Sequence, residues 1–228
     1  MVDVTERQGQ PDVAQDNCQG RSSRLATPPL PDVDGALRAS LARYAGDEVD
    51  LWSSPNRDRR DGFHSLFQYP AMMVPIVQQH LIRAIVEAQP GIASMVDPFV
   101  GAGTTLVAAM RCGLDCYGQD INPFAVLLSQ VKVGPFDTEG LPERVQAVLD
   151  AAKTDASEAV DVDFRNRDKW FQADVSVQLS RLRRAILRED SLWTRRFLWI
   201  TLAETVRFTS NDRTSTYKLH MRPAERIG

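Results

Sequence analysis

The nine-residue string D-P-F-V-G-A-G-T-T, from Asp97 to Thr105, constrains the fold of this chain more than any other feature. A short apolar run over residues 92–97 (IASMVD) predicts a buried strand before it, and a helical period follows it. Gly101 and Gly103 allow the backbone to turn tightly and to approach a ligand closely. The free amides at the start of a helix favour anions. The string therefore predicts a ligand-binding turn between a strand and a helix.

An acidic residue lies in register with this turn. Asp120 ends the next predicted strand (DCYGQD, residues 115–120), 19 residues after Gly101. A carboxylate at this place in an α/β fold accepts hydrogen bonds from ribose hydroxyls. A dinucleotide fingerprint requires a third glycine where Leu106 stands, and a phosphate-binding P-loop requires a lysine that the string lacks. S-adenosylmethionine (SAM) has no phosphate, and its methionine carboxylate suits this shorter glycine turn, so SAM is the expected cofactor.

The order of predicted elements around the turn defines the fold class. Strands are expected over residues 92–97 and 115–120, and a strand, glycine turn, helix, strand and helix in this order begin a doubly wound α/β sheet. We therefore expect an α/β, Rossmann-like fold that is incomplete and carries an added helical region. The expected helices are Pro75 to Ala88, Thr104 to Cys112, Pro123 to Lys132, Leu141 to Lys153, Val175 to Leu187 and Leu192 to Phe208.

Composition divides the chain into three parts. Residues 1–35 are polar and poor in large apolar side chains, and residues 36–52 have only a weak helical period, so residues 1–55 are interpreted as a mobile tail and linker. Residues 56–140 form the expected SAM-binding core, and residues 141–228 form a helical, basic extension. No segment has the length of a membrane span or the apolar stretch of a secretory signal, so a cytoplasmic protein is expected. No second Cys/His pair stands at ligand spacing near Cys112 and Cys116, so no metal site is expected.

The string D-P-F-V-G-A-G-T-T followed by G-Q-D-I-N-P resembles the SAM-binding signature of DNA methyltransferases that modify exocyclic amines, cytosine N4 or adenine N6. In that family the first motif lines the methionine end of SAM. The acidic residue of the second motif holds the ribose, and the residues after it flank the adenine. The resemblance implies a SAM site formed by Asp97, Pro98, Phe99, Gly101, Gly103, Thr104, Asp120, Ile121 and Asn122.

Two further segments are similar to segments of the same family. H-S-L-F-Q-Y-P-A-M-M-V-P, beginning at His64, is similar to a segment that packs over the cofactor, which implies roles for Tyr69 and Pro70; Met72 stands where the family usually has lysine. K-W-F at residues 169–171 and S-N-D-R-T-S-T-Y-K-L-H at residues 210–220 resemble strings that precede the catalytic motif in longer bacterial methylases. Arg213 and Lys218 in the second string are candidate phosphate contacts, with loop-internal bonds as the alternative.

The charge distribution is uneven. Residues 165–228 hold 14 Lys/Arg against 7 Asp/Glu, whereas residues 1–164 hold 13 against 23. A basic third of this kind is suited to DNA phosphates, although a solvated helix face or an acidic protein partner fits the charge equally well.

The catalytic motif of the family, Asp/Asn/Ser-Pro-Pro-Tyr/Phe/Trp, does not occur in these 228 residues. The only Pro-Pro pair is Thr27-Pro28-Pro29-Leu30, and Leu30 cannot stack on a base as an aromatic ring does. No catalytic residue can therefore be named, and a second polypeptide is expected to supply the motif. Two alternatives stay open: a non-catalytic SAM- or DNA-binding subunit or decayed remnant, and a methyltransferase for RNA or protein.

Overall fold

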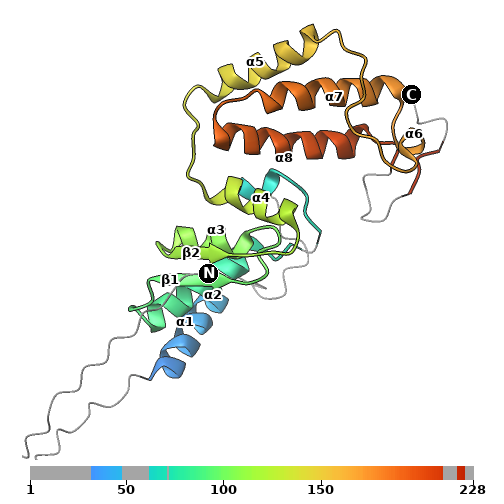
Figure 1. Ribbon diagram of the computed structural model, residues 1–228. Coiled ribbons are helices and arrows are strands. Elements are labelled where there is room, and N and C mark those ends of the chain that lie inside the picture. The colour runs from blue at the N-terminus through green and yellow to red at the C-terminus, as the bar shows by residue number, and fades with distance from the viewer. Residues whose placement is uncertain (1–31, 48–61, 71, 213–219, 224–228) are drawn as a thin grey trace, which may run out of the picture. The chain divides into compact units, whose positions relative to one another are not determined.

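The computed structural model describes residues 32–47, 62–70, 72–212 and 220–223 (Figure 1). The chain divides into two units, residues 1–32 and 33–228, and all elements described below belong to the second. In chain order these elements are α1 (Val33–Asp47), the 3-10 helix η1 (Gly62–Ser65), α2 (Pro75–Ala88), β1 (Ser94–Asp97), α3 (Thr104–Arg111), β2 (Asp115–Gly118), α4 (Pro123–Val133), α5 (Leu141–Thr154), α6 (Arg167–Trp170), α7 (Ala173–Leu187) and α8 (Leu192–Thr209).

The two strands form a parallel pair joined by α3, as the sequence predicted. Ser94 lies opposite Asp115 and Asp97 opposite Gly118. The backbone hydrogen bonding between the two strands continues past their ends. There the amide of Gln119 donates to the carbonyl of Asp97 at 3.0 Å. The carboxyl ends of both strands therefore lie side by side, which is where ligands bind in sheets of this class.

Among the described elements, helices cover one face of this sheet and leave the other exposed. Met95 of β1 and Cys116 of β2 pack against α2 and α3 in a core centred on Ile82, Ala108, Ala109 and Leu114. The next residues along the strands point the opposite way, since side chains alternate along a strand. Val96 and Tyr117, which are cross-strand partners, are 68% and 61% exposed. Within the described residues, β1 pairs with no strand along its other edge.

Residues 33–47, which the sequence placed in the tail and linker, form α1 and pack against α2. Tyr44 is buried beside Ala84, and its hydroxyl donates to the carboxylate of Glu87 at 2.5 Å. Ser40 donates to the same carboxylate at 2.9 Å, and Arg43 forms an ion pair with it. Leu37 and Leu41 pack into the same apolar cluster, so α1 belongs with the folded unit.

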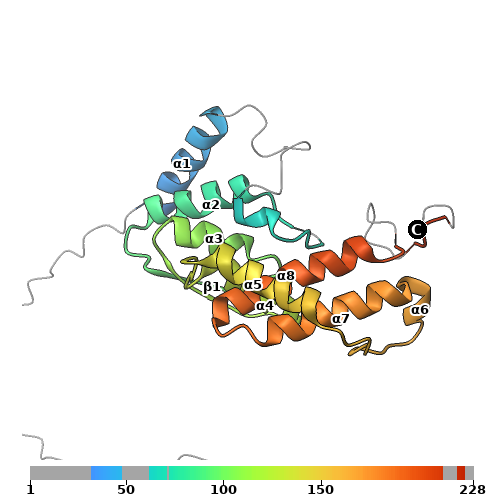
Figure 2. The ribbon, with the colours of Figure 1, turned by 90° about the horizontal axis from the view of Figure 1, so that it is seen from above.

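The helical extension is built on α5, α7 and α8, with α7 between the other two in Figure 1; Figure 2 gives the view from above. Their shared core consists of Val148, Ala152, Ala185, Ile186 and Leu198. An apolar hollow of about 220 Å³ lies in this region, and Phe164, Phe171 and Val206 are among its lining residues.

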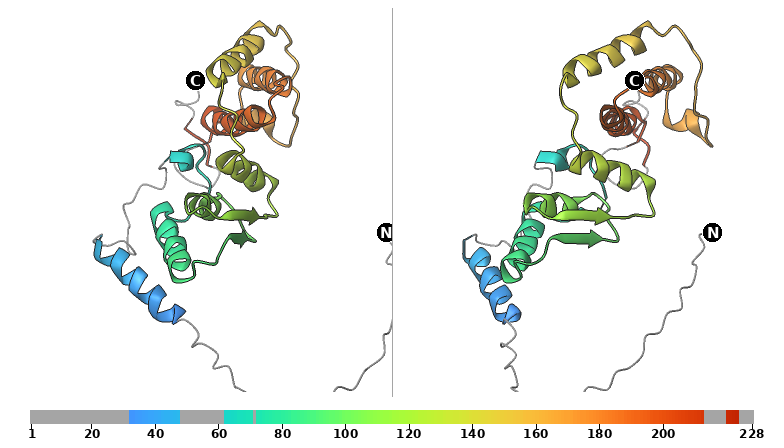
Figure 3. Two further views of the ribbon diagram at one scale, coloured as in Figure 1. Left: turned by 90° about the vertical axis from the view of Figure 1, so that its left-hand side faces the viewer. Right: turned by 60° about the vertical axis from the view of Figure 1, so that its left-hand side comes forward.

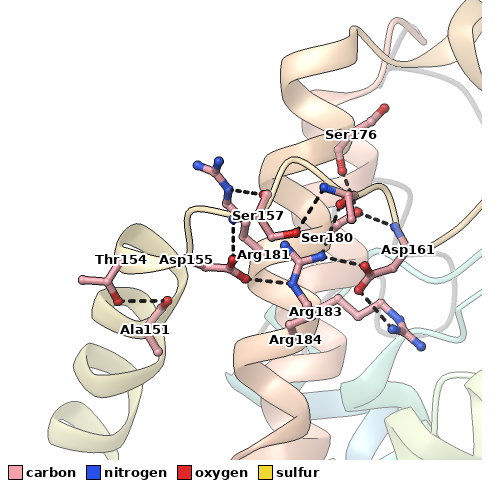
Figure 4. A network of polar contacts seen from close by, with 11 residues as sticks. Ala151, Thr154, Asp155, Ser157, Asp161, Ser176, Ser180, Arg181, Arg183 and Arg184 are labelled. Atoms are coloured by element: carbon pink, nitrogen blue, oxygen red, sulfur yellow. Dashed lines mark hydrogen bonds and ion pairs between the residues drawn. The ribbon is translucent and has the colours of Figure 1, made fainter.

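A polar network fixes the loop between α5 and α6 against α7 (Figure 4). The guanidinium of Arg184 lies between two carboxylates, donating from Nε to Asp155 at 2.7 Å and from Nη1 to Asp161 at 2.6 Å. Arg183 reaches the second oxygen of Asp161 at 3.3 Å. The backbone amide of Asp161 donates to the Ser180 hydroxyl at 3.0 Å.

Helix α4 connects the sheet region to the helical extension. It packs against α3 on one side and α8 on the other, as Figure 3 shows. Leu128 and Val131 of α4 are fully buried with Ile200 of α8. None of the described helices combines the length and apolar character that a membrane span requires.

Candidate cofactor site

The glycine turn has the backbone conformation that its sequence predicted. Gly101 and Gly103 have φ values of 46° and 73°, which other residues adopt only at a cost. The amide of Gly103 donates to the carbonyl of Val100 at 2.7 Å and closes the turn directly before α3. The turn thus joins the end of β1 to the start of a helix, as an anion-binding turn requires.

Asp120 is tied to the turn from the neighbouring strand end. Its Oδ2 accepts a hydrogen bond from the amide of Gly101 at 2.9 Å, and its Oδ1 accepts one from the amide of Asn122 at 2.9 Å. These backbone amides, that of Asn122 foremost, hold the pKa of Asp120 below its usual range. The side chain is therefore a fixed carboxylate at the carboxyl ends of both strands.

Tyr69 brings the segment upstream of α2 to the same place. The Asn122 side-chain amide donates to the Tyr69 hydroxyl at 3.2 Å, and the Tyr69 ring lies 3.7 Å from the position that a Cβ at Gly101 would take. Pro70 beside it is exposed, whereas His64, at the start of this segment, is almost fully buried. Tyr69, Gly101, Asp120 and Asn122 therefore meet at one point although they come from three separate sequence motifs.

The first motif also presents an exposed aromatic ring. The Asp97 carboxylate accepts a hydrogen bond from the amide of Phe99 at 2.9 Å, which turns the chain at the end of β1. Phe99 is 84% exposed and Ile121, after Asp120, is fully exposed. Pro98 is exposed beside them. Large apolar side chains exposed beside fixed polar groups are typical of ligand sites rather than of a closed surface.

Gly103 and Thr104 face the interior. A Cβ at Gly103 would lie 2.8 Å from the Ser129 hydroxyl of α4, so glycine is needed here for the close approach of that helix. Thr104 is only 2% exposed. The predicted ligand contacts of Gly103 and Thr104 stay a prediction, and with buried side-chain positions only their backbones could make them. Gly101 is the glycine of the turn whose Cβ position is free of close contacts.

One residue of the turn's surroundings escaped the sequence analysis. Lys132, in the last turn of α4, is fully buried, and its Nζ donates to the carbonyl of Ala102 at 2.7 Å. The sequence does contain a pattern that predicts the burial of this lysine, because Lys132 falls at helical spacing from the buried residues Ala125 and Ser129.

The two halves of the third motif lie together. The amide of Asn211 donates to the carbonyl of Trp170 at 2.8 Å, and its side chain donates to the carbonyl of Lys169 at 3.1 Å. Asn211 thus has a structural role. The candidate phosphate contacts Arg213 and Lys218 lie outside the described residues.

Comparison with known proteins agrees with these motifs. The chain is similar to type II methyltransferases. It is 29% identical over 212 residues to the type II methyltransferase M.MvaI of Kocuria varians, a match that covers 87% of this chain and 45% of that protein. It is 28% identical over 124 residues to the type II methyltransferase M.MjaII of Methanocaldococcus jannaschii, covering 54% of this chain and 22% of that protein.

The chain thus spans less than half the length of these curated relatives. No family model matches it, and no solved structure matches it. The sequence around the glycine turn resembles that of DNA methyltransferases, and the similarity to these two proteins supports this resemblance.

Proposed function

We propose that this chain is the SAM-binding part of a DNA methyltransferase that transfers a methyl group to an exocyclic base amine. The observation that carries the proposal is the convergence of Tyr69, Gly101, Asp120 and Asn122 at the carboxyl ends of two parallel strands. Three sequence motifs that resemble the same enzyme family supply these residues. The similarity to two type II methyltransferases supports the same activity.

The Asp120 carboxylate fits the ribose of SAM. An ionised carboxylate offers about four acceptor sites on its two oxygens. Each oxygen of Asp120 accepts one hydrogen bond from a backbone amide, of Gly101 or of Asn122, which fixes its orientation. Acceptor sites remain on both oxygens, so the group suits the two adjacent hydroxyls of a ribose.

The two ends of SAM have suitable surroundings on either side of this carboxylate. The glycine turn and the start of α3 favour the methionine carboxylate, because a helix N-terminus carries partial positive charge. The exposed side chain of Ile121 follows Asp120 directly and suits one face of the adenine. SAM bound there would supply the methyl group.

Transfer to a base amine requires a further set of groups. The lone pair of the exocyclic nitrogen is delocalised into the ring, so hydrogen-bond acceptors must hold the amine while it attacks the methyl group in line. The flipped base also needs an aromatic stacking partner. The family's catalytic motif provides both, and these 228 residues do not contain it. We propose that the motif lies outside these 228 residues, on a partner or downstream chain.

The exposed face and edge of the two-stranded sheet support the proposal that a partner chain packs against this part of the protein. Unpaired strand edges and exposed apolar faces are usually covered in stable proteins. The edge of β1 that no described strand covers and the exposed pair Val96 and Tyr117 form a surface of this kind. An added strand there would extend the parallel sheet and place its own carboxyl end beside the glycine turn.

We propose that the basic extension faces DNA. Several arginines in its described part, however, form ion pairs with nearby carboxylates. Arg183 and Arg184 pair with Asp161 and Asp155, and Arg207 pairs with Glu204. Such local pairs reduce the field that reaches a phosphate backbone. The proposal for DNA contact therefore depends on the remaining cations, Arg213 and Lys218 included.

The test is transfer of tritiated methyl groups from SAM to mixed-sequence duplex DNA. The full chain is assayed alone and together with the product of the neighbouring reading frame. We expect no transfer by the chain alone and transfer by the pair. The pair carrying Gly101→Leu is the control for dependence on this SAM site.

Robust transfer by the chain alone would contradict the proposed division of labour. The double substitution of Pro28 and Pro29 by alanine then decides where the catalytic site lies. Loss of transfer on this substitution would assign catalysis to Thr27-Pro28-Pro29-Leu30, and unchanged transfer would place it elsewhere in the 228 residues.

A further inference from the structure

Lys132 is the largest fully buried side chain among the described residues. It reaches from the end of α4 to the glycine turn, where its Nζ donates to the carbonyl oxygen of Ala102 at 2.7 Å. Ala102 stands between the two left-handed residues Gly101 and Gly103. The lysine therefore contacts the middle of the turn from within the protein.

The charge of Lys132 has no counterion among the described residues. Buried ammonium groups are rare and are normally paired with a carboxylate. Here the only acceptor observed is one backbone carbonyl, although an ammonium group has three protons to donate. Burial lowers the pKa of Lys132 to about 8, so the group is still mostly protonated at neutral pH.

Other polar groups surround the turn on this inner side. The hydroxyls of Thr104 and Ser129 are buried, since the two residues are 2% and 4% exposed, and neither has a hydrogen-bond partner in the part of the chain that the structure describes. Stability alone does not explain this arrangement, because apolar residues of similar volume often replace buried charges without loss of stability. A buried cation without a counterion behind an anion-binding turn indicates a role in ligand binding.

The direction of the Ala102 carbonyl explains how Lys132 would act. A carbonyl oxygen that faced the ligand would repel an approaching carboxylate, whereas the hydrogen bond to Lys132 holds this oxygen on the inner side of the turn. The ammonium group also adds positive charge behind the turn's amides. Interactions of this kind are weakly screened in a buried environment.

We propose that Lys132 is a positioning residue for the carboxylate end of the cofactor. It holds the glycine turn with the Ala102 carbonyl directed inward and contributes charge that favours a bound carboxylate. The inference rests on the proposed function and extends it to a residue outside the recognised motifs.

The test compares two ligands by calorimetry on the full chain. S-adenosylhomocysteine carries the amino-acid carboxylate, and 5′-methylthioadenosine has the same adenosine and thioether without it. We expect Lys132→Met to weaken binding of S-adenosylhomocysteine roughly tenfold or more, as loss of a charged hydrogen-bonding group does. Binding of 5′-methylthioadenosine should change by less than about twofold. Lys153→Met removes an exposed lysine of α5 and is the matched control.

The outcomes separate this inference from the proposed function. Equal weakening of both ligands by Lys132→Met would show a general structural role and overturn the inference alone. Failure of the wild-type chain to bind either ligand would overturn the proposed SAM site, and the inference with it.

A second measurement covers the case in which Lys132→Met does not fold. Amide hydrogen exchange of the wild-type chain is measured over residues 99–105 and 128–133 with each ligand at saturation. We expect S-adenosylhomocysteine to protect the end of α4 together with the turn, and 5′-methylthioadenosine to leave the end of α4 unprotected. Equal protection of residues 128–133 by the two ligands would contradict the proposed coupling.

Discussion

The carboxylate of Asp120 accepts a hydrogen bond from the backbone amide of Gly101 at 2.9 Å, across 19 residues of sequence. This bond joins the ends of two parallel strands and links the proposed ribose contact to the turn that would hold the methionine end. A change at either residue is therefore expected to affect both ends of the site.

Replacing Gly101 by leucine is expected to abolish binding of S-adenosylhomocysteine. The side chain would extend from a backbone with φ of 46° into the space beside Tyr69, where the cofactor is proposed to lie. Calorimetry checks this. Gly113→Leu is the matched control, because Gly113 also has a positive φ, 74°, but no atom within 4 Å of its Cβ position. Equal loss of binding in both variants would indicate backbone strain and not a filled site.

Replacing Asp120 by alanine is expected to weaken binding of S-adenosylhomocysteine about ten- to hundredfold. The substitution removes charge-assisted hydrogen bonds to the ribose and also leaves the Gly101 amide without its acceptor. Asp115→Ala, at the exposed start of β2, removes the same charge away from the site and should leave affinity unchanged. A second comparison uses S-adenosylhomocysteine and its 2′-deoxy analogue on the wild-type chain. Equal affinity for the two ligands would contradict the proposed contact between Asp120 and the ribose 2′-hydroxyl.

Lys132 is expected to give the chain a pH-dependent stability. Because burial lowers its pKa to about 8 in the folded state, the unfolded chain binds more protons between pH 8 and its ordinary pKa of 10.5. Stability from this group therefore rises with pH across that window, by about 3 kcal/mol for the full shift. Urea unfolding at several pH values should show this rise in the wild-type chain relative to Lys132→Met. Parallel curves for the two proteins would contradict it.

Arg184 is expected to hold the loop between α5 and α6 in place. Its removal leaves Asp155 and Asp161, which are only 16% and 17% exposed, without their closest cationic partner. Arg184→Met should therefore lower the melting temperature, whereas Arg188→Met, at the exposed end of the same helix, should not. Thermal unfolding followed by circular dichroism compares them. Matching melting temperatures would mean that the network contributes no net stability.

DNA binding by the basic extension is expected to depend on Arg213 and Lys218. Replacing both by alanine should weaken binding similarly on all sequences and reduce the salt dependence of the logarithm of the binding constant by up to about 2. Fluorescence anisotropy at several salt concentrations measures this. Arg83 and Lys153 replaced together remove the same charge from other helices and serve as the control. A salt dependence that falls equally in both double variants would indicate a general charge effect.

Local patterns determined much of this structure. The helix predicted from Pro75 to Ala88 has these bounds in the structure, because its apolar spacing and its first-turn proline are properties of neighbouring residues. The glycine turn and the position of Asp120 after β2 were also predictable, since a tight turn and a strand end have short-range sequence signals. The similarity of the glycine string to a known signature added an expected ligand to this geometry.

Only the tertiary structure showed which side chains meet across long stretches of sequence. In the structure, the Tyr69 ring lies next to Gly101, and Ser129 of α4 packs so closely against Gly103 that only glycine fits there. Lys132 of the same helix donates a hydrogen bond to the carbonyl of Ala102 in the turn. The tertiary structure also left Val96 exposed on a strand that the sequence predicted to be buried, beside the exposed Tyr117 of the second strand. The physical reason is that periodicity specifies which face of an element is apolar, whereas the neighbour that covers this face is decided by packing between distant elements.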